Sequence, residues 1–181
     1  PQDIILGNSA TYGIHLLANG LPLAQGDEVL VMQNDFPSNI LPWVALRKKG
    51  VQVRELKPQG HVLTVDEIAA GISPSTKVLC LSWVHTFSGH KIDPVKIGEL
   101  CREKGIIFIL NCSQVIGAFD IDISRLPVDA IVCAGYKWLC GPYGTGFCWI
   151  KPELREKLQY NSAYWQSVLS EVQLNSSEPI E

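Results

Sequence analysis

Short apolar segments alternate along this chain with helical segments of about ten residues, and this alternation constrains the fold more than any other feature. Residues 29–32 are apolar throughout, which is typical of a strand buried on both faces of a parallel sheet. Further strands are expected at 51–56, 77–84, 106–110, 127–134 and 146–150. Helices are expected at 9–19, 40–49, 65–72, 93–104 and 153–158. The pattern predicts an α/β domain with a mostly parallel sheet flanked by helices.

Two of the helix starts carry capping residues. Asn8 or Ser9 can cap the first helix, and Thr64 followed by Glu67 has the pattern of a capping box. We expect one domain over residues 1–160, followed over 161–181 by an irregular tail or the start of a further C-terminal region.

Composition and charge disfavour several classes of protein. The 181 residues carry a net charge of −3 and no long cluster of Lys or Arg, so the electrostatic footprint of a nucleic-acid-binding protein is missing. No apolar run approaches the roughly 18 residues of a membrane span. None of the six cysteines forms a CxxC pair, and three lie in apolar strands, which fits a reduced, cytoplasmic protein.

The common motifs for nucleotides, ester hydrolysis and metals are missing from the sequence. There is no P-loop, no GxGxxG after a first strand and no GxSxG elbow. His85 and His90 have no partners at metal-ligand spacing, so we expect solvated loop histidines and no metal site.

Lys137 is the residue that carries the clearest chemical signal. It follows the apolar strand expected at 127–134 and precedes a loop with three glycines. Its neighbours Tyr136, Trp138 and Leu139 are bulky. Partial burial lowers the pKa of an ammonium group and makes the amine a better nucleophile, and such lysines form Schiff bases with substrates or with pyridoxal phosphate. The alternative is a strand-end lysine whose charged end reaches water.

Polar and aromatic residues follow several of the expected strands, at 34–36, 85–89, 111–114 and 136–137. In open α/β sheets, ligands bind beyond the carboxyl ends of the strands. The aromatic ring, carboxamides, hydroxyl and lysine found there predict a pocket for a flat, polar, phosphorylated ligand.

The residues at these strand ends belong to longer blocks, at 8–14, 26–31, 36–43, 81–89, 110–117 and 135–147. In this order the blocks resemble the class V aminotransferase family of pyridoxal-phosphate enzymes, which includes cysteine desulfurases, selenocysteine lyases and isopenicillin-N-epimerase-like proteins. The resemblance covers residues 5–150. It implies the large domain of the aspartate-aminotransferase-like PLP fold with its last strand antiparallel, pyridoxal 5'-phosphate as cofactor, an amino-acid substrate and a homodimer.

The resemblance also implies roles for single residues. Lys137 falls on the lysine that forms the Schiff base and later moves the proton at the substrate's α-carbon. Ala10 and Thr11 fall where the first amides of a helix hold the cofactor phosphate, an arrangement that the helix dipole favours. Phe36 falls on the residue, often histidine, whose ring stacks on the pyridine; phenylalanine stacks without exchanging a proton.

Three further cofactor contacts follow in the same way. Gln114 falls on the residue that hydrogen-bonds the cofactor's phenolic oxygen, and Thr86 falls where asparagine often makes a similar contact. Tyr136 replaces a histidine and can reach the phosphate with its hydroxyl. Ala134 replaces a serine that often contacts phosphate.

Asn111 is the largest departure from the family pattern, since the family has aspartate there, against the pyridine nitrogen. An amide holds the proton on that nitrogen less strongly than a carboxylate, by about 1–2 kcal/mol. The small domain that supplies the substrate's arginine, and a desulfurase's nucleophilic cysteine, also have no counterpart in these residues. The chain is expected to hold the cofactor platform without most of the substrate-recognition half.

Three hypotheses about function follow. The first is a PLP-dependent enzyme acting on an amino acid, with desulfurase, lyase, epimerase and transaminase all open. The alternative is a catalytically weakened or non-enzymatic relative that binds cofactor or a partner. The third, a nucleotide-binding α/β domain, lacks a phosphate loop.

Overall fold

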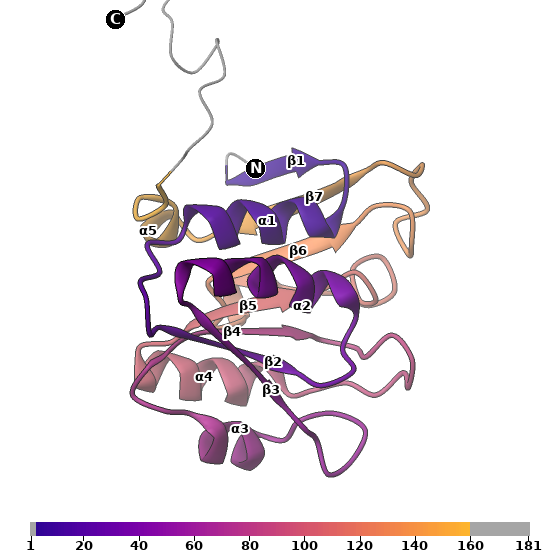
Figure 1. The fold of residues 1–181 in the computed structure, drawn as a ribbon. Coiled ribbons are helices and arrows are strands. Elements are labelled where there is room, and N and C mark those ends of the chain that lie inside the picture. The colour runs from indigo at the N-terminus through magenta and orange to yellow at the C-terminus, as the bar shows by residue number, and fades with distance from the viewer. Residues whose placement is uncertain (1–2, 160–181) are drawn as a thin grey trace, which may run out of the picture.

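The computed structural model of the chain describes residues 3–159, in which seven strands form one sheet (Figure 1). The strands are β1 (Ile4–Gly7), β2 (Glu28–Met32), β3 (Gln52–Leu56), β4 (Thr76–Ser82), β5 (Ile107–Asn111), β6 (Ala130–Ala134) and β7 (Gly146–Ile150). Their order across the sheet is β1-β7-β6-β5-β4-β2-β3. Only β7 runs antiparallel to its neighbours, β1 and β6. The predicted mostly parallel sheet with an antiparallel last strand is confirmed.

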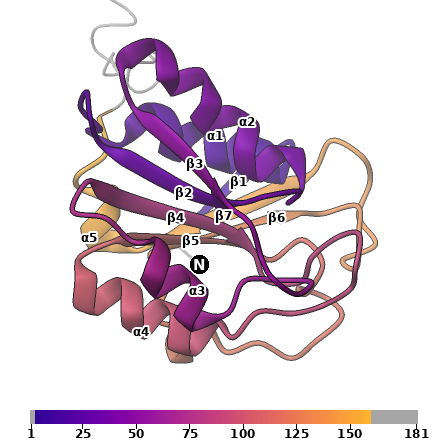
Figure 2. The same ribbon diagram turned by 60° about the horizontal axis from the view of Figure 1, so that its bottom comes forward.

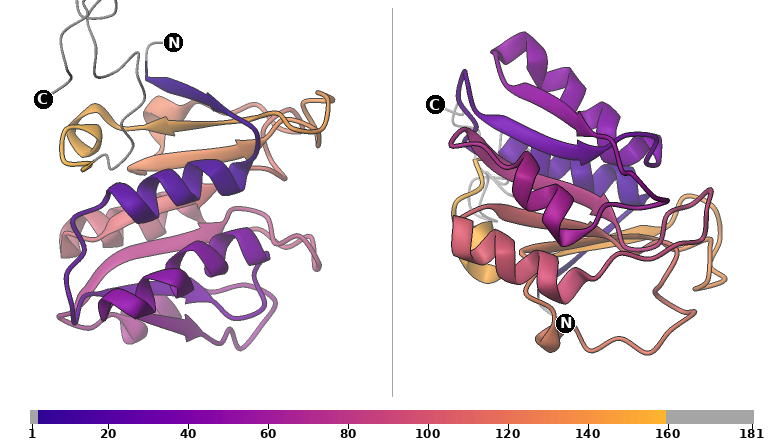
Figure 3. Two further views of the ribbon diagram at one scale, coloured as in Figure 1. Left: turned by 45° about the horizontal axis from the view of Figure 1, so that its top comes forward. Right: turned by 90° about the horizontal axis from the view of Figure 1, so that it is seen from below.

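Helices cover both faces of the sheet (Figure 2). They are α1 (Ala10–Gly20), α2 (Pro37–Val44), α3 (Val65–Gly71), α4 (Pro94–Lys104) and α5 (Pro152–Arg155), with 3-10 turns η1 (Ala45–Lys49) and η2 (Ile123–Arg125). Helices α1 and α2 lie side by side on one face, and α3 and α4 cover the other (Figure 3). Within residues 3–159, no helix combines the length and apolar character needed to cross a bilayer.

The alternation of side chains along β2 explains why both faces need a cover. Val29 and Val31 are fully buried with α1 and α2, whereas Leu30 and Met32 are buried with α3 and α4. Burying an aliphatic side chain of this size stabilises the fold by about 1.5–3 kcal/mol. A strand that is apolar at every position therefore belongs in the middle of three layers, as its sequence predicted.

Both predicted caps are present, but some element boundaries differ from the expected ones. The Ser9 hydroxyl accepts the N–H of Tyr12 at the start of α1, and the Thr64–Glu67 capping box is complete. Helix α2 begins at Pro37, because proline suits the first turn of a helix, and it tightens to a 3-10 turn after Val44. Strand β1 was not predicted, since four residues with one partner at the sheet edge give too little pattern. The tail predicted at 161–181 lies outside the described residues.

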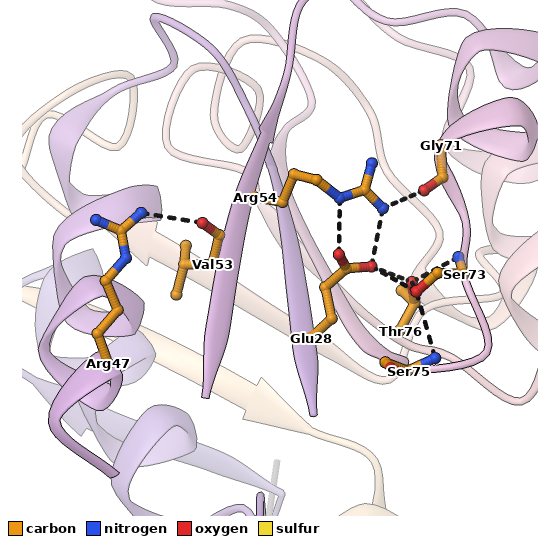
Figure 4. Close-up of polar contacts among 8 residues, drawn as sticks. All are labelled: Glu28, Arg47, Val53, Arg54, Gly71, Ser73, Ser75 and Thr76. Atoms are coloured by element: carbon orange, nitrogen blue, oxygen red, sulfur yellow. Dashed lines mark hydrogen bonds and ion pairs between the residues drawn. The ribbon is translucent and has the colours of Figure 1, made fainter. Parts of the chain in front are cut away.

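A half-buried ion pair between Glu28 and Arg54 lies at the amino ends of β2 and β4 (Figure 4). Glu28, 4% exposed, accepts hydrogen bonds from Arg54 at 2.7 and 2.9 Å, from Ser73 at 2.9 Å and from Thr76 at 2.6 Å. The hydrogen bonds from Arg54 outweigh burial and lower the pKa of Glu28 to about 2. This cluster joins three strands at the edge opposite the loops that follow their carboxyl ends.

Candidate active site

A pocket lies between the first turn of α1 and the carboxyl ends of β2, β4, β5 and β6, where the loops gather at the right of Figure 1. All eight residues to which the sequence assigned a role line this pocket: Ala10, Thr11, Phe36, Thr86, Asn111, Gln114, Tyr136 and Lys137. The lining also includes Ser9, Ser38, Ser82, Val84, Ser113 and Ala134. The structure therefore brings the predicted residues together, while their individual roles stay predictions.

Lys137 lies in the loop that follows β6, and two backbone hydrogen bonds hold this loop closed. The Gly135 N–H donates to Thr145 O at 2.8 Å, and the Gly141 N–H donates to Gly135 O at 2.8 Å. The Lys137 Nζ atom lies 5.0 Å from the centre of the Phe36 ring. Burial lowers the pKa of Lys137 from its ordinary value, and the neighbouring Cys133 opposes this shift. The neutral, nucleophilic amine therefore forms more readily here than on a solvated lysine, as the sequence predicted.

The first turn of α1 offers donors to an anion. Ser9 satisfies the Tyr12 N–H at 3.1 Å, and no hydrogen bond among the described residues occupies the N–H groups of Ala10 or Thr11. A Cβ on Gly146 would come within 2.8 Å of the Ser9 backbone, so glycine lets β7 pass directly beside this helix start. Unpaired amides and the helix dipole together favour a negatively charged group at this point.

His85 fixes the backbone at Asn34, two residues before Phe36, a contact that the sequence did not reveal. His85 is buried, 8% exposed, and its Nε2 donates to the Asn34 carbonyl at 2.9 Å, while Nδ1 lies 2.8 Å from the Ser88 hydroxyl. The expectation of a solvated His85 is wrong, because two strand ends far apart in sequence meet around it. His90 is exposed, as expected, and stacks on His61 with ring centres 4.0 Å apart.

The carboxamide of Gln114 is oriented by a tryptophan. Trp138 Nε1, which can only donate, bonds to Gln114 Oε1 at 3.0 Å. The amide nitrogen of Gln114 therefore faces the other way, toward the Thr86 hydroxyl at 3.5 Å. The Gln114 amide nitrogen and the Thr86 hydroxyl are thus two donors available to an acceptor in the pocket. The ring of Tyr136, another pocket residue, stacks on Tyr143, with ring centres 4.7 Å apart.

Asn111 ends β5 inside a buried polar cluster that the sequence did not reveal. Its Nδ2 donates to Asn39 Oδ1 at 2.8 Å, and its Oδ1 accepts the Ser113 N–H at 3.0 Å. Asn39 in turn contacts Asp35 and Ser82. The position of Asp35 directly before Phe36, at the end of an apolar strand, was the only available sign of this cluster.

The model of the family described as aminotransferase class V matches residues 1–177 of the chain. The chain belongs to the class V aminotransferase family. The resemblance carried by the sequence blocks is thereby confirmed.

Individual relatives agree with this membership. A probable cysteine desulfurase of Methanothermobacter thermautotrophicus is 28% identical over 159 residues, covering 87% of this chain and 40% of the relative. The isopenicillin N epimerase of Streptomyces clavuligerus is 27% identical over 171 residues, covering 91% and 43%. A solved structure of a C-DES mutant with glycine covalently linked to its PLP cofactor gives a TM-score of 0.88 at 23% identity, covering 96% and 47%. The chain spans about two fifths of the length of these curated relatives.

The donor set in the pocket of this member of the class V aminotransferase family fits pyridoxal phosphate. The pocket combines an amine, a flat aromatic face, unpaired helix-start amides and an oriented carboxamide, which match the aldehyde, ring, phosphate and phenolic oxygen of that molecule. Among residues 3–159 there is no group of three or more His, Cys, Asp or Glu side chains arranged to hold a metal ion.

Proposed function

We propose that this chain is the pyridoxal-phosphate-binding part of an enzyme that acts on an amino acid. The observation that carries the proposal is the position of the Lys137 amine, 5.0 Å from the centre of the Phe36 ring in a pocket that also holds the first amides of α1. An amine, a stacking surface and an anion site within one pocket have few other uses in combination.

Each residue has a defined task in this proposal. Ala10 and Thr11 bind the phosphate with their N–H groups, Phe36 orients the ring by stacking, and Gln114 donates to the phenolic oxygen. When bound, the cofactor supplies an electron sink for bond cleavage at the α-carbon of an amino acid. Lys137 holds the cofactor and then moves the proton at that α-carbon, a role that suits an amine whose pKa burial has lowered.

The reaction type stays open between desulfuration, lysis, epimerisation and transamination, because the pocket residues named above serve all four. We further propose a cytoplasmic homodimer. Large apolar side chains are exposed next to the pocket residues, with Phe87 71% and Tyr143 87% accessible. An exposed apolar rim of this kind suits a surface that a second subunit covers.

The proposal is tested by adding pyridoxal phosphate to the full-length protein and recording the visible absorbance of bound cofactor before and after borohydride. Lys137→Ala should abolish the borohydride-fixed product, whereas the matched control Lys77→Ala, at an exposed lysine near the amino end of β4, should retain it. Equal labelling of both variants would reject the assignment of Lys137.

A non-enzymatic, cofactor-binding relative is the second candidate, and Asn111 and Ala134 favour it. Asn111 provides no carboxylate, and Ala134 has no hydroxyl to offer a ligand. The Ala134 N–H donates to Ser113 Oγ at 3.0 Å. This candidate binds cofactor through Lys137 without exchanging α-protons. Deuterium incorporation from heavy water into any tested amino acid decides for the enzyme.

A further inference from the structure

A chain of buried hydrogen bonds runs behind the pocket from Asp35 to Asn111. Asp35 is 3% exposed and Asn39 is fully buried, and Ser82, Asn111 and Ser113 are each buried as well. Asp35 Oδ2 accepts from Asn39 Nδ2 at 2.9 Å, and Asn39 Oδ1 accepts from Asn111 Nδ2 at 2.8 Å. Only the Asn39 carboxamide therefore separates the Asp35 carboxylate from Asn111, the residue that departs from the family pattern.

Asp35 is a buried carboxylate held by hydrogen bonds alone. Oδ1 accepts the Phe36 N–H at 2.7 Å and the Ser82 hydroxyl at 2.7 Å, and Oδ2 also accepts the Ser82 N–H at 2.9 Å. The ion pairs formed within residues 3–159 involve other acidic residues: Asp3, Glu28 and Asp93. Four donors are therefore directed at this side chain, and both of its oxygens act as acceptors.

Asp35 at one end of this hydrogen-bonded series and the Ser113 N–H at the other fix the orientation of the two side-chain amides between them. The carboxylate of Asp35 accepts, so Asn39 presents its nitrogen to it and its oxygen to Asn111. The Ser113 N–H only donates, so Asn111 presents Oδ1 to that group. The two constraints agree, and neither carboxamide can be turned over without losing hydrogen bonds. One lone pair of Asn111 Oδ1 is left for a donor in the pocket.

We propose, resting on the proposed function, that Asp35 is a positioning residue that supplies through Asn39 the negative charge that position 111 lacks. The carboxylate polarises the Asn39 amide, and that amide polarises Asn111, so that Asn111 Oδ1 becomes a stronger acceptor. It then accepts from the protonated ring nitrogen of the cofactor. The electron sink is thereby retained without a carboxylate at position 111.

We call the hydrogen-bonded series Asp35–Asn39–Asn111 the relay. It predicts that restoring the family's carboxylate at position 111 alone brings no gain in cofactor binding. In Asn111→Asp the new carboxylate faces the oxygen of Asn39, whose nitrogen is already committed to Asp35. The Asn39 nitrogen cannot donate to both carboxylates, so the two compete for one amide and one of them is left facing an acceptor. Asp35→Asn removes this competition, so its effect should depend on the residue at position 111.

The test is a double-mutant cycle in the full-length protein, combining Asp35→Asn with Asn111→Asp. The readouts are the dissociation constant of pyridoxal phosphate and the ¹⁵N NMR signal of cofactor labelled at its ring nitrogen, which reports whether that nitrogen is protonated. In the native background Asp35→Asn should weaken binding roughly tenfold or more, as when a charge-assisted hydrogen bond becomes a neutral one, and should shift the signal toward the unprotonated form. In the Asn111→Asp background both effects should vanish.

Two further variants separate this role from a purely structural one. Asn39→Leu breaks the relay but keeps Asp35 and its bond to Phe36, so it should reproduce the shifted ring-nitrogen signal even if Asp35→Asn fails to fold. Thr64→Ala removes the N-cap of α3 and touches neither the pocket nor the relay, so it should lower stability without moving that signal. A ring-nitrogen signal unchanged in Asn39→Leu, or an equal loss from Asp35→Asn in both backgrounds, overturns the inference alone. Absence of Lys137-dependent cofactor binding in the native protein overturns the proposed function, and the inference with it.

Discussion

The Lys137 amine lies 5.0 Å from the centre of the Phe36 ring, although 101 positions separate the two residues in the sequence (137 − 36). They meet because Phe36 follows β2 and Lys137 follows β6, and both strands end at the same edge of the sheet. A ring that stacks on Phe36 and an aldehyde that reaches Lys137 can therefore belong to one small molecule.

Phe36 should contribute to cofactor affinity through its flat face. Phe36→Leu keeps an apolar side chain but removes the stacking surface, and should weaken pyridoxal phosphate binding roughly threefold to tenfold. Phe36→Tyr keeps the ring and is the matched control, with binding expected near native. Fluorescence titration measures both, and equal affinity in Phe36→Leu and Phe36→Tyr would contradict a stacking role.

Two helix caps of similar geometry should differ in their effect on ligand binding. Ser9→Ala and Thr64→Ala each remove an N-cap, and each should lower the free energy of unfolding by about 1 kcal/mol. Only Ser9 lines the pocket, so only Ser9→Ala should also weaken binding of the cofactor phosphate. Denaturant melts combined with cofactor titration check both statements, and weaker binding in Thr64→Ala would count against them.

Glu28 should make stability depend on pH at the acid end. Its pKa is lowered from 4.5 to about 2, so its contribution is fully present above pH 4.5 and is lost as the pH falls toward 2. Glu28→Gln should destabilise the protein at pH 7 by up to about 3 kcal/mol, and by less to the extent that solvent screens the half-exposed Arg54. Unfolding measured against pH should show the native and variant curves converging in acid. The exposed Glu99→Gln serves as the control and should run parallel to native.

Lys137 should react as a neutral amine at a lower pH than solvated lysines, because burial lowers its pKa. The folded state then binds this proton less readily than the unfolded state, so this group's contribution to stability rises with pH up to its ordinary pKa of 10.5. Reductive methylation with a small aldehyde at neutral pH, followed by mass spectrometry, should modify Lys137 ahead of the exposed Lys77. Faster reaction at Lys77 would contradict the expectation.

The sequence predicted those parts of the fold and site that depend on local pattern. The apolar run that begins at Val29 predicts a buried strand, and the caps at Ser9 and Thr64 predict helix starts, each from a few consecutive residues. The bond from His85 to Asn34, and the relay from Asp35 to Asn111, join segments that follow different strands or belong to different elements. Such contacts follow from the order of strands in the sheet, which no single segment encodes.

The point at which the cofactor attaches tests most directly whether Lys137 is the catalytic residue. The full-length protein is loaded with pyridoxal phosphate, reduced with borohydride, digested and mapped by mass spectrometry. One reduced cofactor is expected, on the peptide that contains Lys137. A cofactor spread over exposed lysines such as Lys77, with the peptide containing Lys137 unlabelled, would contradict the assignment.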